Sequence, residues 1–89
     1  MVETAIVAGV GPEKGLGAVL AHRAAKEGLH VFVAGRTLDR LEAVAEAIRA
    51  EGGAATAILC DVTSEAQVID LWNCAEETGP VKLAIYNAG

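Results

Sequence analysis

The feature that most constrains the fold is an alternation of two apolar periodicities along the chain. Short runs rich in β-branched residues recur at residues 4–8, 30–34, 55–59 and 82–86. Continuous apolar runs of this length are typical of strands that are covered on both faces, as in parallel sheets. Between them, apolar residues stand three and four positions apart, which predicts helices. The chain therefore predicts the element order β-α-β-α-β-α-β.

Strand–helix–strand units of this length close a parallel sheet through right-handed crossovers. The predicted fold class is α/β, a doubly wound parallel sheet with the strand order 3-2-1-4. The apolar positions of the three predicted helices are Leu16, Val19 and Leu20; then Leu38, Leu41, Val44, Ala45 and Ile48; and finally Val68, Leu71, Trp72 and Ala75. We expect these positions to face the sheet.

Glycine, proline and capping residues predict where the helices begin and end. The predicted ends are Gly28, Gly52-Gly53 and Gly79-Pro80. We expect glycine there to take the left-handed conformation, and proline cannot continue a helix. Ser64, with Gln67 three residues later, predicts a capping box in which each side chain satisfies a backbone N–H at the start of the third helix.

Composition and charge exclude several classes of function. Apolar residues make up 53% of the chain and charged residues 21%, which predicts a folded domain. Twelve acidic residues against seven Lys and Arg give a net charge of -5, without the basic stripe that nucleic acid requires. The apolar runs are far shorter than the roughly 20 residues that span a bilayer, and Glu3 replaces the basic start of a signal peptide. We expect a soluble, cytoplasmic protein that binds neither nucleic acid nor membrane.

The cysteines and histidines lack the spacing of metal ligands. Cys60 and Cys74 do not have CxxC spacing, and no pair of histidines lies near them in the sequence. We expect both cysteines to be reduced, buried thiols and the chain to hold no metal. His22 and His30 are expected to be surface or packing residues without a carboxylate partner.

A glycine-rich turn, Gly9 to Gly17, joins the first predicted strand to the first predicted helix. Glycine lets the backbone turn tightly and come close to a ligand. The start of the helix then offers unpaired N–H groups and a partial positive charge to a phosphate. The turn therefore fits a diphosphate, although a purely structural tight turn fits the same glycines.

The spacing of these glycines excludes two familiar phosphate-binding patterns. GxGxxG requires a glycine where Lys14 stands, and a Walker A loop requires Lys-Ser or Lys-Thr where Leu16 follows the last glycine. The turn instead reads G-x-x-x-G-x-G from Gly11 through Gly15 to Gly17.

In this spacing the sequence resembles the short-chain dehydrogenase/reductase family. Three further segments are similar to that family's residues at the ends of its next strands: Ala-Gly-Arg-Thr at 34–37, Cys-Asp-Val-Thr at 60–63 and Tyr-Asn-Ala-Gly at 86–89. The resemblance covers the whole chain and implies a Rossmann-type NAD(P)-binding fold. It also implies that residues 1–89 are the N-terminal part of a single domain. The family's catalytic Ser and Tyr-x-x-x-Lys lie downstream of Asn-Ala-Gly, so we expect no catalytic residue within this chain.

The activity that the resemblance implies is hydride transfer between NADP(H) and an alcohol or carbonyl substrate, with this chain supplying the dinucleotide-binding half. It further implies a homo-oligomer for the full-length enzyme. The alternative is a dinucleotide-binding sensor or partner module without catalysis, and residues 1–89 do not separate the two. A phosphate-binding domain for another nucleotide is a third possibility.

Cofactor choice is predicted at the end of the second strand. Proteins that select NAD carry Asp or Glu there for the ribose 2′-hydroxyl, whereas NADP needs a cation for its 2′-phosphate. Arg36 stands at this position. By resemblance, Lys14 matches a position at which NADP-preferring members are basic. Asp39 is expected to be a first-turn acid of the second helix. The sequence therefore favours NADP (NADPH) over NAD.

The resemblance also assigns residues after the third and fourth strands. Asp61 would accept a hydrogen bond from the adenine amino group and Val62 would pack on the ring, while the alternative for Asp61 is the start of a turn before Ser64. Residues 87–89 would border the cofactor ribose. The complete predicted cofactor-binding set is Gly9, Gly11, Lys14, Gly15, Leu16, Gly17, Arg36, Asp61, Val62, Asn87, Ala88 and Gly89.

Overall fold

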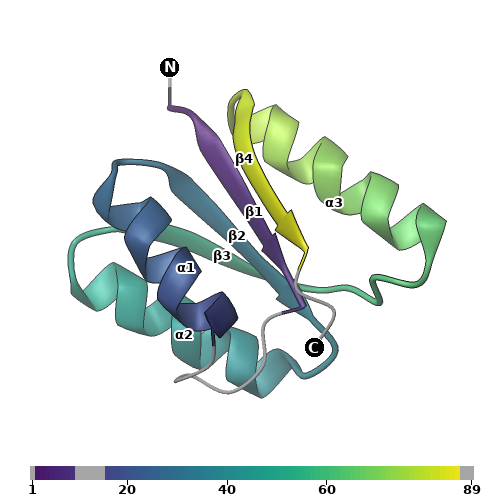
Figure 1. The fold of residues 1–89 in the computed structure, drawn as a ribbon, viewed down its shortest axis with the longest axis horizontal. Coiled ribbons are helices and arrows are strands. Elements are labelled where there is room, and N and C mark those ends of the chain that lie inside the picture. Colours follow the sequence, from purple (N-terminus) through teal and green to yellow (C-terminus); the bar gives the residue numbers. More distant parts are fainter. Residues whose placement is uncertain (1, 10–15, 87–89) are drawn as a thin grey trace.

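The computed structural model describes residues 2–9 and 16–86 of the 89-residue chain. In chain order its elements are β1 (Thr4–Ala8), α1 (Leu16–Lys26), β2 (His30–Gly35), α2 (Leu38–Ala50), β3 (Ala54–Leu59), α3 (Glu65–Thr78) and β4 (Val81–Tyr86) (Figure 1). The predicted alternation of strands and helices is confirmed. Each strand begins and ends within one residue of its predicted bounds.

The strands of the described residues form a parallel sheet in the order β3-β2-β1-β4 (Figure 1). β1 pairs with β2 on one side, where Val7 is opposite Val33, and with β4 on the other, where Val7 is opposite Ile85. The predicted order 3-2-1-4 is confirmed. Because all pairs are parallel, the carboxyl ends of the strands meet at one edge of the sheet.

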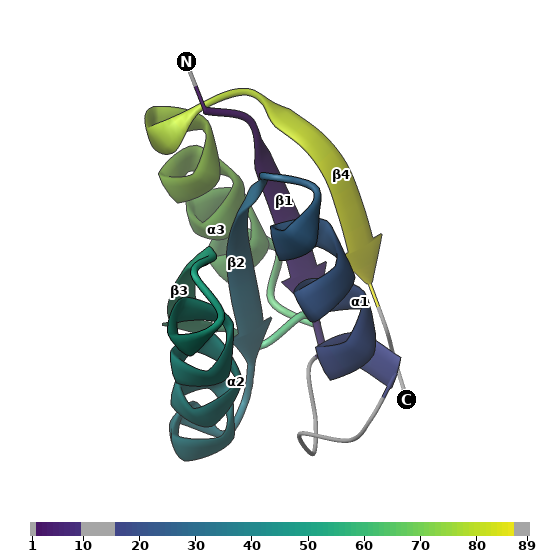
Figure 2. The ribbon, with the colours of Figure 1, turned by 90° about the vertical axis from the view of Figure 1, so that its left-hand side faces the viewer.

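Helices cover both faces of this sheet, with α1 and α2 on one face and α3 on the other (Figure 2). Every residue of β1 is buried. Its side chains alternate between the two faces, so that Val7 belongs to the cluster under α1 and α2 and Ile6 to the cluster under α3. This double covering explains the continuous apolar runs of β1 and β2, whose residues are almost all buried. Helices on both faces of a parallel sheet confirm the doubly wound α/β class.

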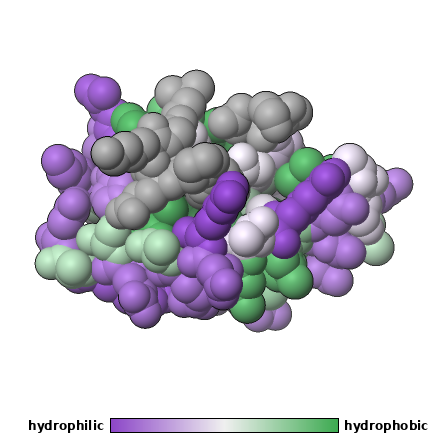
Figure 3. Space-filling model, turned by 90° about the horizontal axis from the view of Figure 1, so that it is seen from below, coloured by the Kyte–Doolittle hydropathy of each residue, from purple (hydrophilic) through white to green (hydrophobic). Residues whose placement is uncertain are grey.

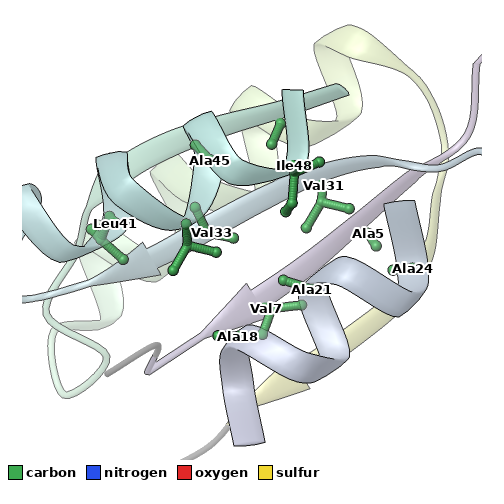
Figure 4. Close-up of a cluster of buried hydrophobic side chains, with 12 residues drawn as sticks. Ala5, Val7, Ala18, Ala21, Ala24, Val31, Val33, Leu41, Ala45 and Ile48 are labelled. Carbon is green, nitrogen blue, oxygen red and sulfur yellow. The ribbon is translucent and has the colours of Figure 1, made fainter. Parts of the chain in front are cut away.

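The face of α1 that packs on the sheet differs from the predicted one. Val19 is 53% exposed, whereas Ala18, Ala21 and Ala24 are buried against β1 and β2 (Figure 4). Small alanine side chains allow the helix to approach the sheet closely, so they, rather than the larger Val19, take the inner face. In α2 the prediction holds for Leu41, Val44, Ala45 and Ile48, but Leu38 is exposed.

The predicted left-handed glycines are confirmed after two of the helices. Gly28 follows α1 and Gly52 follows α2, and both have a φ of +90°. The expectation is wrong for Gly79 after α3, which has an extended backbone with a φ of 174°. Close packing explains glycine at this position, because a Cβ atom on Gly79 would lie 1.7 Å from the backbone oxygen of Val2.

The capping box of α3 forms only in part. The Ser64 hydroxyl accepts the N–H of Gln67 at 3.4 Å, as predicted. The side chain of Gln67 does not return to Ser64. Its Oε1 instead accepts the N–H of Asp61 at 2.8 Å, because the Ser64 N–H already donates to the Asp61 carbonyl. The capping residues of α3 are thus tied to the turn that follows β3.

A buried threonine joins the start of β1 to the start of β4. The Thr4 N–H donates to the carbonyl of Pro80 at 2.8 Å. The Thr4 hydroxyl lies 3.3 Å from the Gly79 carbonyl and 3.2 Å from the Pro80 carbonyl. These hydrogen bonds hold the start of β1 beside Gly79 and Pro80.

Gly79→Ala is therefore expected to lower the free energy of unfolding by about 3 kcal/mol, the upper end of the usual cost of overpacking. The matched control is Gly52→Ala, where a Cβ atom would meet nothing within 4 Å and only the positive φ opposes the substitution. That control should cost about 1 kcal/mol. Urea unfolding of the two variants beside the wild type measures both losses. Equal losses would contradict the packing argument.

Candidate functional site

The predicted site residues that the structure describes lie at the carboxyl edge of the sheet. Gly9 follows β1, Arg36 follows β2, and Asp61 and Val62 follow β3. Gly17 lies in the first turn of α1. Figure 3 looks at the molecule from this side and shows hydrophilic surface interrupted by small hydrophobic patches. Open α/β sheets bind their ligands outside the carboxyl ends of their strands, so the fold brings these residues to the expected place.

The remaining predicted site residues lie outside the described part of the chain. They are Gly11, Lys14, Gly15, Asn87, Ala88 and Gly89. Leu16 begins α1, but its side chain also lies outside what the structure describes.

The backbone leaves β1 through Gly9 in a conformation that favours glycine. Gly9 has a φ of +82°. Its N–H donates to the Ala34 carbonyl at 2.8 Å, which extends the pairing of β1 and β2 by one residue beyond the strand. A side chain at this φ would be strained, so the turn is built for glycine at its first position. Gly17 is buried, with the alanine face of α1 beginning directly after it.

Arg36 and Asp61 face each other at the ends of neighbouring strands. The Arg36 Nη2 atom lies 3.5 Å from the Asp61 Oδ1 atom. The two residues meet because β2 and β3 are in register, with Gly35 opposite Leu59, and the Cys60 N–H donates to the Gly35 carbonyl at 2.8 Å. The side chain of Arg36 is 71% exposed. It is therefore a cation that can reach a ligand at this edge.

Asp61 is held by the turn that it begins. Its Oδ1 atom accepts the Thr63 N–H at 2.9 Å and the Thr63 hydroxyl at 2.7 Å. The hydrogen bond from the Thr63 side chain, followed by the one from its backbone and then by the positive charge of Arg36, lowers the pKa of Asp61. Asp61 is thus a carboxylate at neutral pH. The turn that was the alternative interpretation of Asp61 is observed, while the hydrogen bond to adenine stays a prediction.

The residues around Arg36 and Asp61 lie only partly as the sequence predicts. Val62 is half-buried against the apolar cluster under α3. Asp39 lies in the first turn of α2, as predicted. Sequence analysis missed the roles of Thr63 and Gln67, which hold Asp61 through its side chain and its N–H. The Asp-x-Thr pattern could have indicated the first of these, because aspartate often accepts hydrogen bonds from the residue two positions later.

The two cysteines differ in burial. Cys60 is buried, as predicted, and burial together with the negative charge of Asp61 raises its thiol pKa. Cys74 is exposed, so the expectation that it is buried is wrong. The inner face of α3 is occupied by Leu71 and Ala75, and this leaves Cys74 on the outer side.

The two histidines also differ from each other. His22 Nδ1 lies 3.4 Å from the Glu51 carboxylate, so the expectation that it has no carboxylate partner is wrong. The fold brings Glu51, at the end of α2, beside α1. His30 is a packing residue, as predicted: its ring stacks on Phe32 at 4.8 Å between centroids, and its Nε2 lies 2.8 Å from the Thr56 hydroxyl.

Two further features bear on function. None of the helices in residues 16–86 has the length and hydropathy needed to cross a bilayer. Within the described residues, His, Cys, Asp and Glu side chains do not gather in threes in a way that could hold a metal ion.

Replacing Thr63 tests what holds Asp61 in its charged form. Thr63→Val removes the largest cause of the lowered pKa, so the pKa of Asp61 should rise toward its ordinary value. Arg36→Ala should raise it too, because the charge and the side-chain hydrogen bond of Arg36 are two further causes of the lowered pKa, each smaller than the Thr63 side chain. Carboxyl ¹³C NMR titration measures both shifts, with Thr78→Val, at the far end of α3, as the control that leaves the pKa unchanged. A larger rise in Arg36→Ala would show that the ion pair dominates.

Comparison with known proteins agrees with this geometry. The family model described as short chain dehydrogenase matches residues 3–89. Glycine betaine reductase ATRR from Emericella nidulans is 40% identical over 80 residues, which is 89% of this chain. Among solved structures, an actinorhodin polyketide ketoreductase variant with NADPH matches 99% of the chain at 36% identity and a TM-score of 0.85. A metagenomic short-chain oxidoreductase in complex with NADP matches 98% of it at 26% identity and a TM-score of 0.85.

The chain spans only part of the proteins that it matches. It covers 6% of the betaine reductase, and 32% and 29% of two further curated relatives. It covers 33% of the ketoreductase chain and 39% of the metagenomic oxidoreductase chain.

Proposed function

The chain belongs to the short-chain dehydrogenase family, and on that basis we propose that it binds a nicotinamide dinucleotide at the carboxyl edge of its sheet. It does so as part of an oxidoreductase that moves a hydride between nicotinamide and an alcohol or carbonyl carbon. Residues 1–89 form the N-terminal, dinucleotide-binding part of one Rossmann domain. The groups that transfer protons to and from the substrate lie outside this segment.

The observation that carries this proposal is the convergence of Gly9, Arg36 and Asp61 at the ends of three adjacent parallel strands. Gly9 allows the backbone to turn sharply beside a ligand. Arg36 offers an exposed cation, and Asp61 offers a carboxylate that a fixed turn holds in place. These groups suit a ligand that carries both phosphates and a hydrogen-bonding base.

The bound nicotinamide supplies the hydride chemistry, while this chain binds and orients the dinucleotide. Within that role, Gly17 leaves room for a diphosphate at the start of α1, where unpaired backbone N–H groups favour an anion. Asp61 accepts a hydrogen bond from the adenine amino group, and Val62 lies beneath the ring. Gly11, Lys14, Gly15, Leu16 and residues 87–89 complete the proposed site.

NADP is the proposed cofactor in preference to NAD. Arg36 follows β2 directly, at the position where NAD-selective proteins place an acid. Its guanidinium offers several donors in a planar fork that matches a phosphate. Two of the matched structures were solved with NADPH or NADP, which supports the same choice.

The experiment that tests the proposed function uses the protein that carries this chain. NADPH and NADH are titrated while nucleotide fluorescence is followed, and a panel of aldehydes and ketones is then added while NADPH absorbance is measured. We expect saturable binding and carbonyl-dependent oxidation of NADPH. Binding without turnover on the panel or in the reverse direction with alcohols would favour the non-catalytic module. Failure to bind either nucleotide would overturn the proposal.

Arg36→Ala tests the choice of cofactor. A charge-assisted hydrogen bond to phosphate contributes about 1.5–3 kcal/mol, so its loss should weaken NADPH binding by on the order of ten- to a hundredfold. NADH binding should barely change, because NADH lacks the 2′-phosphate. The matched control is Arg23→Ala, which removes an exposed arginine from the last turn of α1. Titrations of the wild type and both variants with both nucleotides at fixed salt measure six affinities, and equal weakening of NADPH and NADH binding by Arg36→Ala would refute the assignment.

A further inference from the structure

The Arg36–Asp61 pair places a negative charge directly beside the cation that would receive a phosphate. The Asp61 Oδ1 atom lies 3.5 Å from Arg36 Nη2. The other two salt bridges among the described residues, His22–Glu51 and Lys82–Glu3, involve neither Arg36 nor Asp61. Arg36 therefore does not act as an isolated positive charge at the carboxyl edge of the sheet.

Asp61 is fixed in this position by contacts that do not depend on Arg36. Thr63 donates to its Oδ1 atom from both backbone and hydroxyl, and the Asp61 N–H donates to Gln67. A carboxylate on a free side chain could rotate away when an anion approached Arg36. Asp61 would lose two hydrogen bonds by doing so, and its charge therefore stays close to the guanidinium.

We propose that Asp61 is a specificity-determining residue, whose carboxylate competes with the 2′-phosphate of the cofactor for Arg36 and so limits the preference for NADP over NAD. The inference rests on the proposed function, because it requires Arg36 to meet the 2′-phosphate. The guanidinium can serve both anions, since its five N–H donors leave several free beside the single Nη2 contact. The phosphate nevertheless approaches a cation whose charge the Asp61 carboxylate partly neutralises.

The expected size of this effect is modest, because water reaches both side chains and screens their charges. Asp61 is 43% exposed and Arg36 71%. Charge pairs at such positions change binding equilibria by about two- to fivefold. Asp61 would therefore adjust the preference that Arg36 establishes and would not reverse it.

Asp61→Asn isolates this effect from the other roles of the residue. The asparagine keeps a side-chain oxygen that can accept the two Thr63 hydrogen bonds, but it carries no charge. Any contact with adenine is common to NADPH and NADH, so it cancels in the ratio of their dissociation constants. That ratio reports only on the 2′ position of the ribose.

The test measures dissociation constants of NADPH and NADH for the protein that carries this chain and for Asp61→Asn, Arg36→Ala and the double variant, at one salt concentration. Asp61→Asn should raise the preference for NADPH about two- to fivefold, with no such rise when Arg36 is already absent. Asp70→Asn, an exposed acid on α3, should leave the ratio unchanged. Asp61→Ser provides a second uncharged variant if the asparagine lowers the yield of folded protein.

The outcomes separate this inference from the proposed function. An unchanged or lowered NADPH preference in Asp61→Asn overturns the inference, and a lowered one would show that Asp61 positions Arg36 for the phosphate. An equal rise in the Arg36→Ala background also overturns it, because the carboxylate would then act on the phosphate without Arg36. If the wild type binds neither nucleotide, the proposed function itself fails.

Discussion

The burial of β1 between two helical layers is the constraint on which the rest of the structure depends. β1 pairs with β2 and β4, and its alternate side chains enter two different apolar clusters. Strands covered on both faces are typical of parallel sheets, in which crossover helices connect the strands. The carboxyl ends of the strands then collect at one edge. The predicted site residues that follow β1, β2 and β3, namely Gly9, Arg36 and Asp61, meet there although they are far apart in sequence.

β1 and β2 could be predicted from the sequence because burial on both faces requires a continuous apolar run. The inner face of α1 could not, because alanine is a weak apolar signal beside Val19. Ala18 and Ala21 face the sheet because their small side chains permit close approach, and that benefit exists only once the sheet is present. The exposure of Cys74 and the extended backbone of Gly79 could not be predicted for the same reason. Burial and close contact depend on neighbouring elements.

The candidate site shows the same division between local pattern and tertiary contact. The sequence predicts that Arg36 follows β2 and that Asp61 follows β3. It also predicts the hydrogen bond between the Ser64 hydroxyl and the Gln67 N–H. The approach of Arg36 to Asp61 depends on the register of β2 and β3, which fixes how far each chain extends beyond the sheet. The hydrogen-bond partner of Gln67 could not be predicted either. A capping box would pair its side chain with the Ser64 N–H, but that N–H already donates to the Asp61 carbonyl.

The net negative charge of the chain disfavours an anionic ligand, whereas the cation Arg36 at the carboxyl edge of the sheet favours one. A net charge of -5 repels an anionic dinucleotide at long range, but salt screens such repulsion beyond about 8 Å at physiological ionic strength. Discrimination between NADP and NAD must therefore arise from groups within a few ångströms of the 2′ position. In the proposed site, Arg36 would supply the attraction for a 2′-phosphate and Asp61, held by Thr63, would oppose it. On this proposal, cofactor preference would follow from the balance of two neighbouring side chains, and a change in the overall charge of the chain would leave it almost unchanged.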